Sequence, residues 1–371
     1  MKKQVFRLIW LVIALILVLC GCKTEDEEQN AISIDFSDRS DCSVQAFLDE
    51  KIIYRMRGSS QYYVLDPKTD TEKELGSISD FSIGSASFAV SSGKYYAEVT
   101  NSDRETILYE IDYKNYSITP VDTCYDISPL VYLYKVPDGI LRLKTPSEES
   151  GRTTFFDLFH PETGDTEVVL QASENDFYGN AAVYNNTLFV LTSHLRPNAP
   201  SEWVLQSYSL ETYQLIDEID LKAIESYLTQ GRVAEMEVFG NYIYFANLSE
   251  QGIIAEIANG KVTPLVERQF LRAAKCFNQS EQQKERLFYI RTSDECFVLH
   301  FDTGEISSFN AKLHDGYDIQ YVMIDGDKLL MSEEKISSSK FVNDKEILHV
   351  YDYHDFVNQK NFSSTGDGSL C

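Results

Sequence analysis

The side chains from which catalytic and metal sites are usually built are scattered along this 371-residue chain. The six histidines are residues 160, 194, 300, 314, 349 and 354. His300 and His349 fall inside predicted strands, where packing accounts for them. The metalloprotease, nucleophile-elbow, P-loop and dinucleotide-binding motifs are all absent. The sequence therefore predicts no catalytic residue, no metal site and no cofactor. It leaves enzymatic activity open but favours a protein that is not an enzyme.

Four residues carry side chains that favour binding or that stand out in an acidic chain. They are Arg152, His194, Arg196 and Trp203. Trp and Arg are enriched among the residues that dominate interface energies. Arginines are conspicuous here because the formal net charge is −25. We predict these four residues as contacts on a binding rim, carried by long loops at 145–153, 193–203 and 332–346. The alternative is that these are ordinary surface loops.

Strands must hold these loops, and residues 285–306 show the strand pattern most clearly. Phe297 and Leu299 alternate with Cys296 and Val298, so the two pairs point to opposite faces of a strand. An Asp-Thr-Gly turn then reverses the chain, because Asp bonds its own backbone and Gly accepts positive φ. The stretch is predicted to form two short strands of one sheet.

The same pattern recurs along the chain. Alternating apolar residues run into a polar or small stop at positions 66, 112, 160, 209, 258, 302 and 352. Successive stops lie 44 to 50 residues apart. A turn and a strand precede each stop, and a short strand follows most of them. Four strands in a repeat of this length are typical of a β-propeller blade.

The repeats are predicted to form a closed ring. A four-stranded sheet with two apolar faces cannot bury both alone, and stacking such sheets around an axis covers every face. The seventh repeat lacks its last strand, while residues 31–36 form an extra strand before the first repeat. We predict that residues 31–36 complete the last blade and close the ring.

The first strand of each repeat is predicted to line the axis of the ring. These strands are placed at 45–48, 87–90, 131–134, 181–184, 235–239, 273–277 and 320–324. They are mostly apolar. An enzyme needs convergent polar groups near the axis, so this composition disfavours one. A paired acid and base found there would reverse that preference.

Residues 32–357 resemble bacterial seven-bladed propellers of the WD40-like and TolB-like kind. The resemblance rests on period and pattern, since no Trp-Asp dipeptide ends a strand. It implies an all-β fold, a β-propeller of seven four-stranded blades, with six or eight blades left open. The propeller domain is assigned to residues 31–357, and residues 358–371 are assigned to a polar C-terminal tail.

One short helix is expected near residues 221–230, between the fourth and fifth repeats. Leu221, Ile224, Tyr227 and Leu228 fall on one helical stripe there. This spacing interrupts the period of two that marks the strands.

The N-terminus resembles a bacterial lipoprotein signal. Residues 1–7 carry three basic side chains and no acid, and residues 8–19 are uninterruptedly apolar. That run is too short to span a bilayer comfortably but fits a signal peptide. Leu19-Cys20-Gly21-Cys22 looks like a lipobox. The resemblance implies removal of residues 1–21, lipidation of Cys22 and an acidic tether at 22–30.

The expected partners follow from charge and anchor. The strongly acidic chain lacks the basic footprint that nucleic acid requires. A lipid anchor implies attachment to the cell membrane on its extracytoplasmic side. The chain is also expected to be a monomer. The leading interpretation is a non-catalytic binding or scaffold module for a protein or cell-envelope partner. Two alternatives stay open: a lyase or hydrolase acting on carbohydrate or peptide in the channel, and an accessory subunit of an export or assembly system.

Overall fold

Alternation within the strands places apolar side chains on both faces of each small sheet. In β25 (Glu295–His300), Phe297 and Leu299 pack into one buried cluster with Phe239 of a preceding sheet. Cys296 and Val298 of the same strand pack into a different cluster. Both faces of the strand are therefore covered by neighbouring sheets, as the period of two predicted.

The computed structural model describes residues 31–39, 42–56, 59, 61–78, 87–91, 94–100, 105–125, 132–146, 153–195, 202–229, 233–278, 284–335 and 345–358. The strands of its first half are β1 (Ile32–Asp35), β2 (Cys42–Leu48), β3 (Lys51–Met56), β4 (Gln61–Asp66), β5 (Thr71–Ser77), β6 (Ser87–Ser91), β7 (Lys94–Thr100), β8 (Glu105–Asp112), β9 (Ser117–Tyr125), β10 (Tyr132–Val136), β11 (Gly139–Lys144), β12 (Phe155–His160) and β13 (Asp165–Gln171). Those of its second half are β14 (Asp176–Tyr184), β15 (Thr187–His194), β16 (Glu202–Ser209), β17 (Leu215–Asp220), β18 (Val233–Phe239), β19 (Tyr242–Asn247), β20 (Gln251–Ala258), β21 (Lys261–Gln269), β22 (Leu271–Ala273), β23 (Lys275–Asn278), β24 (Glu285–Ile290), β25, β26 (Ile306–Asn310), β27 (Tyr317–Asp325), β28 (Lys328–Lys335) and β29 (Glu346–Asp352).

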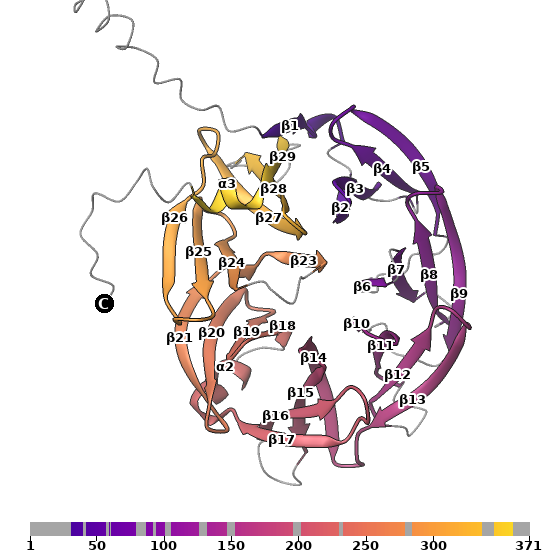
Figure 1. The fold of residues 1–371 in the computed structure, drawn as a ribbon, viewed down its shortest axis with the longest axis vertical. Helices are drawn as coiled ribbons and strands as arrows, with labels where there is room; N and C mark the ends of the chain where they lie inside the picture. Colours follow the sequence, from indigo (N-terminus) through magenta and orange to yellow (C-terminus); the bar gives the residue numbers. More distant parts are fainter. Residues whose placement is uncertain are drawn as a thin grey trace, which may run out of the picture.

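Small antiparallel sheets stand around a ring, with β2, β6, β10, β14 and β18 innermost (Figure 1). Among the described residues, antiparallel pairing joins the strands in sets of four, and we label these sets blades 1 to 7. Blades 1 to 5 are β2–β5, β6–β9, β10–β13, β14–β17 and β18–β21; blade 6 is β22 with β24–β26, and blade 7 is β27–β29 with β1. One parallel contact, Asp220 with Lys261, links blades 4 and 5. The predicted fold class, an all-β propeller-like ring, is confirmed.

The first described strand closes the ring. β1 pairs antiparallel with β29, from Ile32 opposite Val350 to Asp35 opposite Ile347. Phe36, directly after β1, is fully buried, and its backbone N–H donates to Glu346 O at 2.9 Å. The prediction that residues 31–36 complete the last blade is therefore confirmed.

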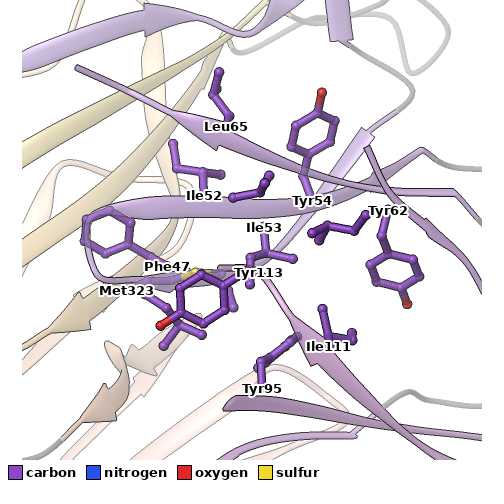
Figure 2. Close-up of a cluster of buried hydrophobic side chains, with 14 of the residues drawn as sticks. Phe47, Ile52, Ile53, Tyr54, Tyr62, Leu65, Tyr95, Ile111, Tyr113 and Met323 are labelled. Atoms are coloured by element: carbon purple, nitrogen blue, oxygen red, sulfur yellow. The ribbon is translucent and has the colours of Figure 1, made fainter. Parts of the chain in front are cut away.

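A buried cluster extends across this closure. Figure 2 shows Ile52 and Tyr62 of blade 1 in the same cluster as Tyr95 of blade 2 and Met323 of blade 7. Apolar contact between consecutive blades thus continues through the junction of the first and last blades, which share one core.

The predicted helix lies between blades 4 and 5. It consists of η3 (Lys222–Ile224) and α2 (Glu225–Thr229), and the apolar stripe expected there is buried. The hydroxyl of Tyr227 anchors it, lying 2.5 Å from Gln251 O and 3.0 Å from Phe245 O, so its single hydrogen is donated to one or shared between these two carbonyl oxygens. Two further short helical segments, η1 (Ser37–Arg39) and α3 (Tyr353–Val357), were not predicted.

The predicted signal peptide (1–21), the tether (22–30) with Cys22, and the C-terminal tail beyond residue 358 lie outside the described residues. Among the described residues, no helix has the length and apolar character needed to cross a membrane.

Candidate functional site at the centre of the ring

The innermost strand of blade 6 changes partner halfway along. β22 pairs antiparallel with β24 of its own blade, and this register ends at Ala273 opposite Phe288. After the buried Ala274, β23 pairs in parallel with β27 of blade 7, starting at Lys275 opposite Met323. Figure 1 shows β23 pointing toward the middle of the ring. The switch breaks the repeat and brings new side chains to the centre.

Three charged residues on the innermost strands whose side chains are described are exposed: Lys135 near the end of β10, Glu235 on β18 and Lys275 on β23. Adjacent blades cover the faces of these strands, so an exposed side chain on them faces the interior of the ring. There it meets water while protein surrounds it on most sides. A register shift between Val233 and Glu235 precedes the exposed carboxylate, and bulges of this kind re-aim side chains.

Arg286, at the start of β24, lies beside these residues. It is buried and contacts the carboxylate of Glu237 and the sulfur of Cys276. Nearby charges raise the pKa of Arg286 despite its burial, so it carries its charge at all physiological pH values. Glu237 is therefore held in place by a permanent cation.

We call Glu235, Glu237, Arg272, Lys275 and Arg286 the central group. It contains three basic and two acidic side chains in a chain whose formal charge is −25. A local surplus of positive charge in an acidic protein is a suitable place for an anionic group, because Arg and Lys donate charge-assisted hydrogen bonds to carboxylate and phosphate.

The pKa values of Glu235 and Lys275, in the central group, depart from their ordinary values. Desolvation raises the pKa of Glu235; Glu237 raises it further, while Arg272, Tyr244 and Lys275 oppose the shift. The hydroxyl of Tyr244 lies 3.4 Å from Glu235 Oε2.

The pKa of the Lys275 ammonium group is shifted in the opposite direction, downward. Desolvation lowers the pKa of Lys275 to about 8, and the carboxylates of Glu235 and Glu237 oppose the shift. A carboxyl group with a raised pKa beside an amine with a lowered pKa is the kind of pair that acid–base catalysis uses.

The described part of the predicted rim does not converge on one site. His194 Nδ1 lies 2.6 Å from Asp176 Oδ1, within blade 4. Trp203 pairs opposite Ser193, one position away, and therefore points to the other face of the sheet. Its ring packs on Gly179, where an added Cβ would lie 3.0 Å from a ring carbon.

Arg152 and Arg196 lie outside the described residues, as does most of each predicted rim loop. Contact of the four rim residues with a partner stays a prediction.

Sequence reasoning missed the central group, although its signal was present. Glu235, Glu237 and Lys275 stand within the two segments predicted to line the axis, 235–239 and 273–277. They are the exceptions to the apolar composition of those segments. Among the described residues, no set of three metal-ligand atoms lies close together at the ring centre; such a set lies instead between blades 6 and 7.

No protein-family profile matches the sequence, and no curated protein matches it. Solved structures that match this chain include Sqt1 of Saccharomyces cerevisiae, at a TM-score of 0.49 and 11% identity over 86% of this chain and 97% of Sqt1. PorZ, a surface component of the type-IX secretion system of Porphyromonas gingivalis, gives a TM-score of 0.47 and 10% identity over 84% of this chain and 39% of PorZ. The computationally designed Ika8 protein gives 0.47 and 10%, over 84% and 82%. At these values the likenesses identify neither a family nor a function.

Proposed function

We propose that this chain is a membrane-anchored, extracytoplasmic lipoprotein whose seven-bladed propeller binds an anionic group of a protein or cell-envelope partner. The observation that carries the binding site is the switch of partner by the innermost strand of blade 6. It brings Lys275 to the ring interior, where its charge adds to those of Arg272 and Arg286. In this role the propeller is a binding module and performs no reaction.

The anchor is part of the same proposal. Lipidation of Cys22 would hold the ring outside the membrane, and the acidic residues of 23–30 would keep it away from anionic lipid. Cys22→Ala removes the acceptor sulfur. We expect this variant to lose incorporation of labelled fatty acid and to leave the membrane fraction, and retention of both in the variant would refute the anchor.

Affinity capture from native membranes tests the binding site. The bait is the full-length lipidated chain, compared with Lys275→Gln and Arg272→Gln. We expect each variant to recover at least about tenfold less partner, because a charge–charge contact with the partner's anionic group is lost. Lys94→Gln is the matched control, since Lys94 pairs with Glu110 at 2.8 Å outside the central group.

The predicted rim is the alternative binding site that the same capture experiment tests. If Lys275→Gln and Arg272→Gln both captured as much partner as the native chain does, the proposed site would be wrong. If the combined alanine substitution of Arg152, His194, Arg196 and Trp203 abolished capture instead, recognition would belong to the rim.

A second function, an enzyme acting at the ring centre, is favoured by one observation. Burial raises the pKa of Glu235 and lowers that of Lys275 to about 8, and neighbouring titratable groups with shifted pKa values are typical of catalytic sites. An acid–base role predicts that Glu235→Gln still retains the captured partner but no longer alters it. Mass analysis of partner incubated with each variant distinguishes an enzyme from a binder.

A further inference from the structure

Three potential metal ligands from distant parts of the sequence meet between blades 6 and 7. Glu333 lies in β28 and His349 in β29, while His314 lies in the connection between β26 and β27. Their ligand atoms are all within 4.8 Å of one another. No sequence motif indicates that these residues meet, because the two histidines stand 35 positions apart with Glu333 between them.

The carboxylate of Glu333 is at the middle of the cluster. Its side chain is fully buried, and one oxygen, Oε1, contacts His314 Nδ1 and lies 3.0 Å from His349 Nε2. The other oxygen accepts from the backbone N–H of His314 at 3.0 Å. The two imidazole rings are nearly parallel, with their centroids 5.9 Å apart.

The other ring nitrogen of His349, Nδ1, also has a hydrogen-bond partner. Nδ1 lies 2.8 Å from the hydroxyl of Ser33 in β1. Metal-binding histidines almost always have their remaining nitrogen hydrogen-bonded in this way, because that contact sets the tautomer and the ring orientation. Ser33 therefore leaves Nε2 of His349 directed at Glu333.

We propose that His314, Glu333 and His349 bind a divalent ion of the Zn²⁺ type through two imidazole nitrogens and one carboxylate oxygen. Two nitrogens and one oxygen are a ligand set that Zn²⁺ accepts, with bonds of about 2.0–2.2 Å. Tetrahedral ligand atoms at such bond lengths are about 3.3 Å apart. The three groups reach that spacing with small adjustments, since His314 is 57% exposed on a connection between blades.

The exposed His314 gives the ion a route from solvent and leaves a coordination position for water. Glu333 is positioned as a ligand, because its buried carboxylate already contacts both histidine side chains and the backbone N–H of His314. Without an ion, the same side chains satisfy each other by hydrogen bonds. The ion takes the place of the protons in these hydrogen bonds, because a coordinating imidazole nitrogen must be unprotonated, and the side chains themselves need little rearrangement.

Such an ion would stabilise ring closure. Ser33 belongs to β1, the strand that completes blade 7, and His314 belongs to the connection from blade 6. An ion bound here joins the closing strand, through His349, to two consecutive blades. This inference does not depend on the proposed binding function.

Zn²⁺ titration of the chelator-treated, full-length chain in detergent tests the site, with bound metal measured after removal of free ion. We expect one tightly held equivalent in the native chain. His349→Gln and His314→Gln each remove one ligand, so both should lose this equivalent. His160→Gln is the matched control: His160 forms a comparable pair with Glu167 at 3.3 Å, and this variant should bind as the native chain does.

Folding and coordination are separated by the choice of variants. His314 is exposed, so His314→Gln leaves no buried cavity, and its circular dichroism should match that of the native chain. Zn²⁺ should raise the Tm of the native chain and of His160→Gln, because a ligand of the folded state stabilises it. It should not raise the Tm of His314→Gln.

Ser33→Ala adds a graded readout. Loss of the contact behind a metal-binding histidine lowers affinity by about 10- to 100-fold without abolishing binding, and we expect this variant to fall in that range. The proposal is overturned if the native chain binds no Zn²⁺, or if folded His314→Gln and His349→Gln bind it as tightly as the native chain.

Discussion

Arg142 donates hydrogen bonds to both carboxylate oxygens of Asp157, with Nε 2.5 Å from Oδ1 and Nη2 3.0 Å from Oδ2. Both residues belong to blade 3 and are buried. Nη1 of the same guanidinium lies 2.6 Å from Asp122 of blade 2, and Lys144 contacts the buried Glu98 of blade 2 beside it. A buried ion network thus joins two consecutive blades.

Arg142→Ala should destabilise the ring strongly. The substitution leaves the carboxylates of Asp157 and Asp122 without their main cation, and breaking a buried ion pair from one side costs about 3–5 kcal/mol. We expect a clear fall in the urea concentration at the unfolding midpoint. Lys284→Ala is the comparison, because Lys284 and Asp302 are 79% and 69% exposed and such pairs contribute almost nothing. Equal midpoints for the two variants would contradict the role of the network.

The lowered pKa of Lys275 predicts a specific pH dependence. Between about pH 8 and its ordinary value of 10.5, the unfolded chain binds a proton on Lys275 that the folded chain has lost. The free energy of unfolding therefore rises with pH across this window. We expect the native chain to gain stability relative to Lys275→Gln between pH about 8 and about 10. Urea unfolding at both pH values measures the difference.

Lys94 gives the control with the opposite sign. Its pairing with Glu110 raises its pKa above the ordinary value of 10.5. The contribution of this pair to the free energy of unfolding is therefore lost only when the pH rises above 10.5. The native chain should show no gain over Lys94→Gln between pH about 8 and about 10. A difference between the native chain and Lys275→Gln that stays constant with pH would show that Lys275 has an ordinary pKa.

The alternation of apolar residues was sufficient to predict the architecture. It assigned Phe297 and Cys296 to opposite faces, and the missing strand of the last repeat identified residues 31–36 as the closing strand. The same pattern could not reveal the central group. A period of two indicates a strand, but it does not say which neighbour the strand pairs with. Nothing in the residues around Lys275 distinguishes pairing with β24 from pairing with β27.

Removal of the closing strand should open the ring. Deletion of residues 31–36 removes Phe36, which is fully buried and packs edge-on against Tyr54 with ring centroids 5.3 Å apart. It also leaves the edge of β29 uncovered, and uncovered edges pair with other chains. We expect the variant to self-associate in size-exclusion chromatography with light scattering. Deletion of residues 23–30 is the control and should leave a monomer; a monomeric, native-like 31–36 deletion would exclude closure by β1.

Gly252 tests whether close packing of blades 5 and 6 positions the central group. A Cβ on Gly252 would lie 2.5 Å from the backbone oxygen of Leu271 and 2.7 Å from its Cβ, so Gly252→Ala must push β22 away. Arg272 follows Leu271 directly, and its displacement should reduce partner capture as Arg272→Gln does. Gly260→Ala is the matched control, because an added Cβ there meets nothing within 4 Å and only the positive φ of 70° is strained, at about 1 kcal/mol. If Gly252→Ala captures partner as well as Gly260→Ala does, the recognition of the anionic group does not depend on the position of β22.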